Sequence, residues 1–229
     1  MIRQRWRDLL FVHWAMPVDA VRPLVPPALE LDQAEGSAWL TLIPFLIAES
    51  RPAALPAILS SAFLETNLRT YVRGPDGEAG IYFFSLEAAS LPAVAAARLL
   101  YGLPYFFAAM SRRVDGARMT YASRRRTGRG ATLEATWTVG EATGPAAAGS
   151  LEHFLIERYV LYVRRRSGLR RGRVRHAPYP LRAAAVEGIS ESLLAAAGLP
   201  PPAGPPLCHH SPGVDVEILG LEPVRMPEA

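Results

Sequence analysis

The stretch that decides the fold is FLETNLRTYVRGPDGEAGIYFFSLEAASLPAVAAARLLYGLPYFFAAM, at residues 63–110. Its first ten residues alternate in character, as a strand does when successive side chains point to opposite faces. The GPDG sequence at residues 74–77 has the composition of a turn, and residues 81–88 follow as a second, apolar strand. The pattern therefore predicts an antiparallel hairpin.

The first strand of this hairpin carries a row of polar residues on one face. At the rise of a strand, Glu65, Asn67 and Arg69 follow one another at about 6–7 Å, with Phe63 and Tyr71 at the two ends. A polar face of this kind is typical of the solvated side of an antiparallel sheet. A carboxylate, an amide and a guanidinium also suit the wall of a cavity that holds a small polar ligand. Both interpretations remain open at this point.

A short alanine-rich helix is predicted after the hairpin. Ser90 is suited to cap its N-terminus, and Pro92 falls in the first turn. Arg98 is the charged residue of this helix, and Gly102 is a typical stop. The apolar and aromatic residues 104–110 then predict a buried strand.

Short strands and few helices make up the rest of the chain. Pro44 indicates that its strand ends there or runs along a sheet edge. The many short segments separated by turn residues predict a β-rich α+β fold, a barrel or sandwich with helical insertions. We expect further strands at residues 9–14, 39–45, 119–125, 131–139, 159–164, 173–177, 181–189 and 214–219, and helices at residues 18–24, 150–158 and 190–197.

The composition limits the class of protein. With 229 residues, half of them apolar, the chain can bury a sizeable core. Cys208 is its single cysteine, which excludes an intrachain disulfide and a four-cysteine zinc site. The apolar runs are too short for a membrane span, and the basic start MIRQRWRDLL makes a poor signal peptide. We therefore expect a cytoplasmic protein with no membrane partner.

All 25 Lys+Arg residues are arginine, so no lysine side chain is available to form a Schiff base. Positive charge is concentrated in Arg112–Arg182, which holds 16 arginines and five acidic residues, although the whole chain carries only +4. Such a region can contact nucleic acid or another acidic surface, or it can be the solvated side of a sheet. It has no nucleic-acid motif and few interleaved aromatics, which disfavours nucleic acid as a partner.

The histidines make a weak case for a metal site. His209 and His210 are adjacent, so on a strand they point to opposite faces and cannot chelate one ion together. Cys208 and Asp215 are near them in sequence, whereas His13 alternates with apolar neighbours. The chain has no glycine-rich phosphate loop, no G-x-S-x-G elbow and no H-E-x-x-H helix. We predict no metal and no cofactor.

Several dispersed segments resemble one family. PVDAVRPLVPPALELD, AWLTLIPF, FLETNLRTYV, SLEHFLIERY and HHSPGVDVEIL together look like the YqjF-like family of uncharacterised proteins. That family is similar, more distantly, to the acetoacetate decarboxylase-like superfamily. The resemblance implies a single domain over residues 1–229, with a bent antiparallel sheet closed into a cone-like barrel, a few short helices and a pocket inside. Superfamily relatives often associate, so a homo-oligomer agrees with the resemblance.

Two local matches bear on chemistry. The segment FLE that ends at Glu65 resembles a stretch with an active-site glutamate in the decarboxylases, which implies that Glu65 faces the pocket. RLLYGLP at residues 98–104 resembles a stretch that is followed there by two lysines, one of which forms the Schiff base. Here Tyr105 and Phe106 follow instead. A phenol, with a pKa of about 10, cannot form an imine, so this departure argues against decarboxylation by that route.

Three functions remain open. An interaction protein would use the region Arg112–Arg182. An enzyme would use Glu65 as general acid or base, because burial raises the pKa of a carboxyl group unless Arg69 or Arg98 pairs with it. A binding protein would hold a small carbonyl- or carboxylate-containing molecule in the pocket. The candidate ligand-binding residues, besides Glu65, are Asn67, Arg69, Arg98, Tyr105 and His13.

Overall fold

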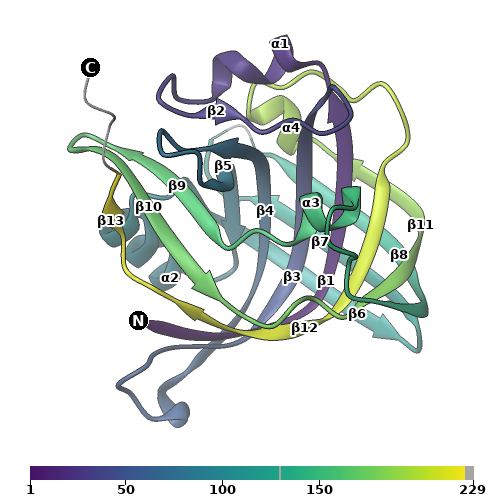
Figure 1. Cartoon of the computed structure of the whole chain (residues 1–229). Coiled ribbons are helices and arrows are strands. Elements are labelled where there is room, and N and C mark those ends of the chain that lie inside the picture. Colours follow the sequence, from purple (N-terminus) through teal and green to yellow (C-terminus); the bar gives the residue numbers. More distant parts are fainter. Residues whose placement is uncertain (129, 225–229) are drawn as a thin grey trace.

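The computed structural model describes residues 1–128 and 130–224, which form one sheet with short helices around it (Figure 1). In the described residues the sheet has 13 strands. They are β1 (Ile2–Met16), β2 (Glu30–Leu31), β3 (Ala38–Pro52), β4 (Ser61–Arg73), β5 (Ala79–Ala88), β6 (Tyr105–Asp115), β7 (Arg118–Arg125), β8 (Thr132–Gly144), β9 (Val160–Arg165), β10 (Gly168–Arg175), β11 (Leu181–Glu191), β12 (Leu207–Ile218) and β13 (Glu222–Pro223). The helical segments are α1 (Val18–Val21), η1 (Arg22–Leu24), η2 (Ala57–Leu59), α2 (Leu91–Ala96), η3 (Ala97–Tyr101), α3 (Leu151–Ile156) and α4 (Leu193–Ala196).

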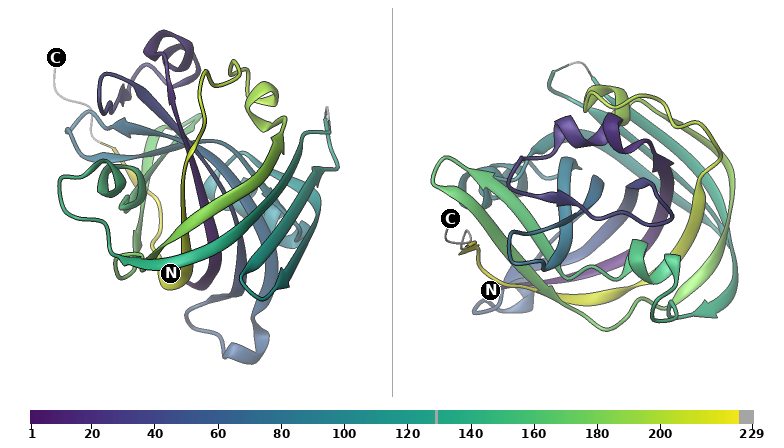
Figure 2. Two further views of the ribbon diagram at one scale, coloured as in Figure 1. Left: turned by 90° about the vertical axis from the view of Figure 1, so that its right-hand side faces the viewer. Right: turned by 45° about the horizontal axis from the view of Figure 1, so that its top comes forward.

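The sheet closes on itself in two circuits of strand pairing. Pairing of β4 with β5 closes the larger circuit, which runs β5-β6-β7-β8-β11-β12-β1-β3-β4. Pairing of β10 with β12 closes the smaller circuit, which runs β9-β5-β4-β3-β1-β12-β10. Some of these joins are short, since β12 meets β10 and β11 over two residue pairs each. The sheet is therefore partly ringed, as the two views in Figure 2 show.

Strands β12, β1, β3, β4 and β5 belong to both circuits and form a shared wall. On one face of this wall, Leu10 and Leu68 pack with Trp137 in the core of the larger circuit. On the other face, Leu9 and Phe45 belong to the core of the smaller circuit. Because both faces are covered, the wall strands have apolar residues in both sets of alternating positions.

The predicted hairpin is confirmed, since β4 pairs antiparallel with β5 across the turn at residues 74–77. The polar row of β4 faces the core of the smaller circuit, between Phe63 and Tyr71. Glu65, Asn67 and Arg69 are all buried. The interpretation of this row as a solvated outer face is therefore wrong.

The expected antiparallel pairing holds for most of the sheet, but β5 pairs parallel with both β6 and β9. A parallel neighbour requires a crossover connection instead of a tight turn. The helix predicted after the hairpin supplies the crossover between β5 and β6 as α2 and η3. As predicted, Ser90 caps it by accepting a hydrogen bond from the Ala93 N–H, and Gly102 ends it in the left-handed conformation, with φ 69°.

Pro44 does not end its strand, contrary to the prediction. It lies inside β3 and is paired with Thr66 of β4. On the other side of β3, the pairing with β1 is interrupted between Leu42 and Leu46, where β1 bulges. Proline lacks a backbone donor and is tolerated where a ladder hydrogen bond is not required. The bulge in β1 therefore explains a proline in the interior of the sheet.

Short helical segments cover the ends of the two cores. Val21 of α1 and Leu193 of α4 pack into the core of the larger circuit, and Leu155 of α3 packs into the core of the smaller one. Among the helices of residues 1–128 and 130–224, none has the length and apolar character needed to cross a membrane.

Candidate functional site

The smaller circuit encloses a cavity of about 220 Å³ beside the polar row of β4. Four residues singled out from the sequence line it together: Glu65, Asn67, Arg69 and Tyr105. Most of the remaining wall is apolar or aromatic and comes from β1, β3, β5, β9, β10 and the crossover helix. A mainly apolar pocket with a few convergent polar groups is the usual form of a small-molecule site.

The strand register gives the order of these residues along the cavity. Gln4 of β1 and Ser50 of β3 are paired and half-buried at the end of the cavity where β4 begins, and their side chains share a 3.0 Å hydrogen bond. Ser50 is also paired with the exposed Ser61 at the start of β4. Moving inward from Ser61, β4 then presents Glu65 and, four residues further, Arg69. The carboxyl group therefore lies between the Ser61 end of the cavity, called its mouth below because Ser61 is exposed there, and the guanidinium.

Glu65 and Tyr105 form a buried acid–phenol pair. The Tyr105 hydroxyl donates a 2.8 Å hydrogen bond to Oε2 of Glu65, whose residue is only 4% exposed. Burial is the main cause that raises the pKa of Glu65 to about 8; the Tyr105 hydrogen bond lowers this pKa in part, and the nearby Glu87 adds to the increase. No arginine of the described chain forms a salt bridge with Glu65, so the carboxyl group is kept neutral at neutral pH.

Arg69 lies at the inner end of the cavity and is 6% exposed. Its Nη2 donates to the backbone carbonyl of Leu155 at 3.0 Å, but its Nε has no partner. Within the described residues, no carboxylate forms a salt bridge with it. Asn67, between Glu65 and Arg69, also has a buried Oδ1 without a partner. These are polar atoms that a ligand can satisfy.

A second guanidinium at the inner end, that of Arg158, has its partners within the protein. Its Nη1 donates to Asp32 at 2.8 Å, and its Nε donates to the Phe154 carbonyl at 2.8 Å. Asp32 also accepts from Arg73 at 2.9 Å. Sequence reasoning missed this group, because Arg158 and Asp32 are distant in the chain and only the fold brings them together.

The structure does not place Arg98 with the cavity residues. Arg98 is exposed on the crossover helix, and its guanidinium lies 6.0 Å from the ring of Phe106. Alanines of the same helix, including Ala93 and Ala97, face the cavity instead. The helix ends in a π-helical segment over residues 97–101, so ordinary α-helical spacing does not give the direction of its side chains.

His13 also does not line the cavity, and it is fully buried on β1, with Thr41 of β3 between it and Arg69 in the strand register. Its Nδ1 lies 2.8 Å from Oγ1 of Thr41, which in turn contacts the Tyr71 hydroxyl. That hydroxyl donates to the Leu155 carbonyl at 2.6 Å. The Tyr71 hydroxyl proton is already donated to Leu155, so the hydroxyl of Thr41 must donate to Tyr71 and accept from His13. The chain of hydrogen bonds therefore fixes the proton of His13 on Nδ1 and leaves Nε2 with a free lone pair.

The other face of the wall holds a polar cluster that the sequence did not reveal. Arg125 of β7 forms a salt bridge with Glu87 of β5 and lies over the ring of Phe106, 3.7 Å from its centroid. Ser85 donates to the same carboxylate at 3.3 Å. Glu87 is fully buried. The cluster lies in the larger circuit, so it influences Glu65 through its charge and not by contact with the cavity.

The two adjacent histidines of β12 point apart, as predicted. His209 lies against His13, with ring centroids 5.5 Å apart, whereas His210 accepts a 3.4 Å hydrogen bond from the indole of Trp137. Asp215 pairs with Arg7 instead of joining them. In residues 1–128 and 130–224, no group of three or more His, Cys, Asp or Glu residues is arranged to hold a metal ion.

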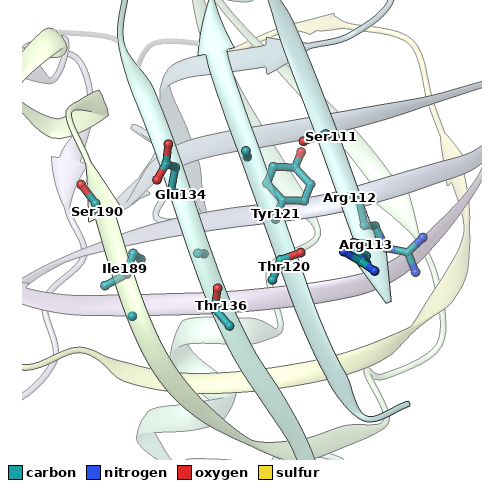
Figure 3. A pocket seen from close by; sticks show the side chains of 12 residues that line it. Ser111, Arg112, Arg113, Thr120, Tyr121, Glu134, Thr136, Ile189 and Ser190 are labelled. Carbon is teal, nitrogen blue, oxygen red and sulfur yellow. The ribbon is translucent and has the colours of Figure 1, made fainter. Parts of the chain in front are cut away.

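A larger groove of about 540 Å³ runs across the outside of β6, β7, β8 and β11 (Figure 3). Its lining includes Ser111, Arg113, Thr120, Glu134 and Ser190. These side chains are half-buried or exposed, so water can satisfy them. The groove contains two arginines of the region Arg112–Arg182 but none of the candidate ligand-binding residues, and the enclosed cavity remains the better candidate.

Comparisons with known proteins identify the family of the chain and proteins with a similar fold. The model of the family DUF2071, described as an uncharacterized conserved protein, matches residues 3–215. The chain is 39% identical over 217 residues to the uncharacterized protein YqjF of Bacillus subtilis, covering 94% of this chain and 89% of that protein.

Solved structures with the same fold include two enzymes. The enduracididine biosynthesis enzyme MppR, solved in complex with pyruvate, superposes with a TM-score of 0.68 at 15% identity, over 97% of this chain and 90% of that chain. An acetoacetate decarboxylase from Legionella pneumophila superposes with a TM-score of 0.61 at 14% identity, over 96% and 84%. At these identities the likeness establishes an acetoacetate decarboxylase-like fold.

Proposed function

The chain belongs to the DUF2071 family and has an acetoacetate decarboxylase-like fold, and from this premise we propose that its cavity binds a small organic acid or carbonyl compound. The observation that carries the proposal is Arg69, a buried guanidinium with an unpartnered Nε and no carboxylate partner in the described chain. A buried, unpaired charge costs several kcal/mol. A carboxylate ligand would remove that cost and satisfy Nε at the same time.

The Glu65–Tyr105 pair supports a carbonyl or hydroxyl group in the same ligand. A carboxyl group with a pKa of about 8 keeps its proton at neutral pH and can donate it to an oxygen acceptor. The structural neighbour MppR was solved with pyruvate, which has both a carboxylate and a carbonyl. Its ligand is a precedent for this class of molecule bound to a protein of this fold.

A Schiff-base decarboxylase does not fit this chain. The sequence contains no lysine, and the position after Pro104 is occupied by Tyr105, which is engaged with Glu65. Imine formation requires an amine side chain. We therefore propose binding or a different chemistry, and not decarboxylation through an imine.

A second candidate function is catalysis by Glu65 itself. A general acid or base works best when its pKa lies near the working pH, and a pKa of about 8 for Glu65 meets that condition. Enolisation and hydration of a carbonyl compound each add a proton to the carbonyl oxygen, which protonated Glu65 can donate, while a proton leaves the α-carbon or the attacking water and returns the carboxylate to its acid form. The alternative of an interaction surface in Arg112–Arg182 has less support, because several of its arginines, such as Arg118, Arg125 and Arg171, are paired within the protein.

The experiment is a calorimetric binding screen of small carboxylates, keto acids and neutral ketones against the wild type and Arg69→Gln. We expect carboxylate ligands to lose at least about tenfold in affinity in Arg69→Gln, as for a charged hydrogen-bonding partner. Arg113→Gln, an exposed arginine outside the cavity, is the matched control and should bind as the wild type does. Equal affinity in all three proteins would refute the proposal.

Turnover separates the two candidates. Glu65→Gln keeps the shape of the side chain but cannot exchange a proton as an acid. Proton exchange or hydration of a bound ketone that disappears in Glu65→Gln, while binding persists, identifies an enzyme. A ligand that binds without any turnover identifies a binding protein.

A further inference from the structure

We propose that the ligand of this cavity is an elongated, linear monocarboxylate of about six to eight carbons, bound with its carboxylate on Arg69 and an oxo or hydroxyl group near its other end on Glu65 and Tyr105. This inference rests on the proposed function and narrows it to one class. It follows from the spacing of the polar groups, their order from the mouth, and the size of the cavity.

The spacing excludes very short acids from using both polar groups. Glu65 and Arg69 are four residues apart on one strand, which places their Cα atoms about 13 Å apart. Arg69 also leans away from Glu65, because it donates to Leu155 and lies 5.8 Å from the ring of Tyr71, two residues further along β4. Two hydrogen bonds of about 2.9 Å cover part of the distance. The remaining ~7 Å needs at least about five carbon–carbon bonds of ~1.5 Å.

The order along the cavity places the anionic group of the ligand at the inner end. Two guanidiniums, those of Arg69 and Arg158, line that end. Asp32 is shared between Arg158 and Arg73. Glu157, the other nearby carboxylate, accepts from the Tyr159 hydroxyl at 2.5 Å and from the backbone N–H of Tyr179 at 2.9 Å. With Arg73 counted, three guanidiniums meet two carboxylates, so the positive charges exceed the negative ones by one, which favours a single carboxylate there.

The wall of the cavity around the polar row suits a hydrocarbon chain. Apart from the polar row, the wall consists mainly of apolar side chains from several strands and the crossover helix, which include Phe63, Leu86, Ala97, Leu161, Val174 and Ile218. Such a wall stabilises methylene groups by roughly 0.8 kcal/mol each, or about fourfold in affinity. A volume of about 220 Å³ equals that of about seven liquid-water molecules. This is the size of a short linear acid and too small for a long fatty acid.

The test is a homologous series of unbranched carboxylates from acetate to dodecanoate, measured by calorimetry on the whole protein, with pyruvate and 7-oxooctanoate added. We expect affinity to rise about fourfold per methylene up to six to eight carbons and then to level off or fall. We expect 7-oxooctanoate to bind about fivefold more tightly than octanoate, as for one net hydrogen bond. In Tyr105→Phe the ratio of these two affinities should fall towards one.

Variants of the crossover helix test the direction of binding. Ala97→Phe fills part of the cavity at the Glu65 end, away from Arg69. It should therefore weaken the binding of octanoate by at least tenfold and have a much smaller effect on the binding of acetate. Ala95→Phe is the matched control, because Ala95 is exposed on the same helix and does not line the cavity. Pyruvate or acetate binding as tightly as octanoate would overturn the chain-length inference and leave the proposed function standing. Failure of every carboxylate to bind would overturn both.

Discussion

The hydroxyl of Tyr105 donates to Oε2 of Glu65 at 2.8 Å, so a phenol from the strand after the crossover helix meets an acid from the central hairpin. This contact depends on the parallel pairing of β5 with β6, in which Leu86 lies opposite Tyr105. Both side chains are removed from water, and this burial raises the pKa of both groups. Their pairing is the basis of the first prediction.

Replacement of Glu65 by Gln should change how stability depends on pH. Burial raises the pKa of Glu65 from 4.5 to about 8, so between these values the folded state binds one proton more than the unfolded state. The free energy of unfolding of the wild type should therefore fall with rising pH, by up to about 1.4 kcal/mol per unit, relative to Glu65→Gln. Urea unfolding of both proteins between pH 4.5 and 9 measures the difference.

Tyr105→Phe provides a second readout of the same pair. The Tyr105 hydrogen bond lowers the pKa of Glu65, so its removal should raise that pKa and move the pH-dependent loss of stability to higher pH. Parallel pH profiles for the wild type and Glu65→Gln would contradict the neutral, buried carboxyl group.

Breaking the Glu87–Arg125 pair should be strongly destabilising. Arg125→Met leaves the fully buried Glu87 without its cation, and loss of one partner of a buried pair typically costs about 3–5 kcal/mol. The double variant Arg125→Met/Glu87→Gln should regain a large part of this loss, because it removes the unpaired charge. Denaturant unfolding of the four proteins in a double-mutant cycle gives the coupling free energy.

Arg113→Met is the control for the loss of an arginine from a strand of this region. Arg113 is exposed on β6, so its replacement should change the free energy of unfolding by no more than about 0.5 kcal/mol. Additive effects in the cycle would show that Glu87 and Arg125 do not interact.

His13 should be neutral, with its proton on Nδ1. The hydrogen-bond chain through Thr41 and Tyr71 requires this tautomer, and burial, His209 and Arg69 hold the pKa of His13 well below its usual value. Nitrogen-15 NMR of the imidazole, assigned with His13→Gln, should show a protonated Nδ1 and an unprotonated Nε2 down to pH 5.5. Protonation of Nε2 near pH 6.5 would contradict the arrangement.

Gly213→Ala should destabilise the fold by at least about 3 kcal/mol. The residue has φ 128°, and an added Cβ would clash with the Trp6 carbonyl oxygen of the neighbouring strand. Gly188 on β11 has open space around it and no left-handed φ. Gly188→Ala is therefore the matched control and should change stability little. Thermal unfolding of both variants is sufficient, and a mild effect at Gly213 would argue against the close approach of β12 and β1.

The sequence predicted local structure well where one element determines it. The alternation in residues 63–72, the turn at 74–77 and the cap at Ser90 depend only on neighbours in the chain, and all three are confirmed. The strand that contains Pro44 was mispredicted, because a distant bulge in β1 removes the usual penalty for proline. Local patterns cannot report a bulge in another strand.

The candidate site was predictable in part. Glu65, Asn67 and Arg69 share one strand face, so their common orientation follows from strand geometry. That this face covers a cavity, and not solvent, depends on how β9 and β10 close the smaller circuit. Arg158 reaches the cavity from a segment about 90 residues away in the chain. No spacing rule connects residues over such a distance.

The double use of strands β12, β1, β3, β4 and β5 also limits how this protein can vary. A substitution that enlarges a side chain on the cavity side moves backbone that the opposite core needs in place, so ligand preference and stability are not independent. Loss of either circuit would expose the apolar core on the corresponding face of the shared strands to water. We therefore expect one cooperative unfolding transition for the whole chain. Changes of specificity should arise most easily from the crossover helix, because its alanines line the cavity but it is not part of the shared wall.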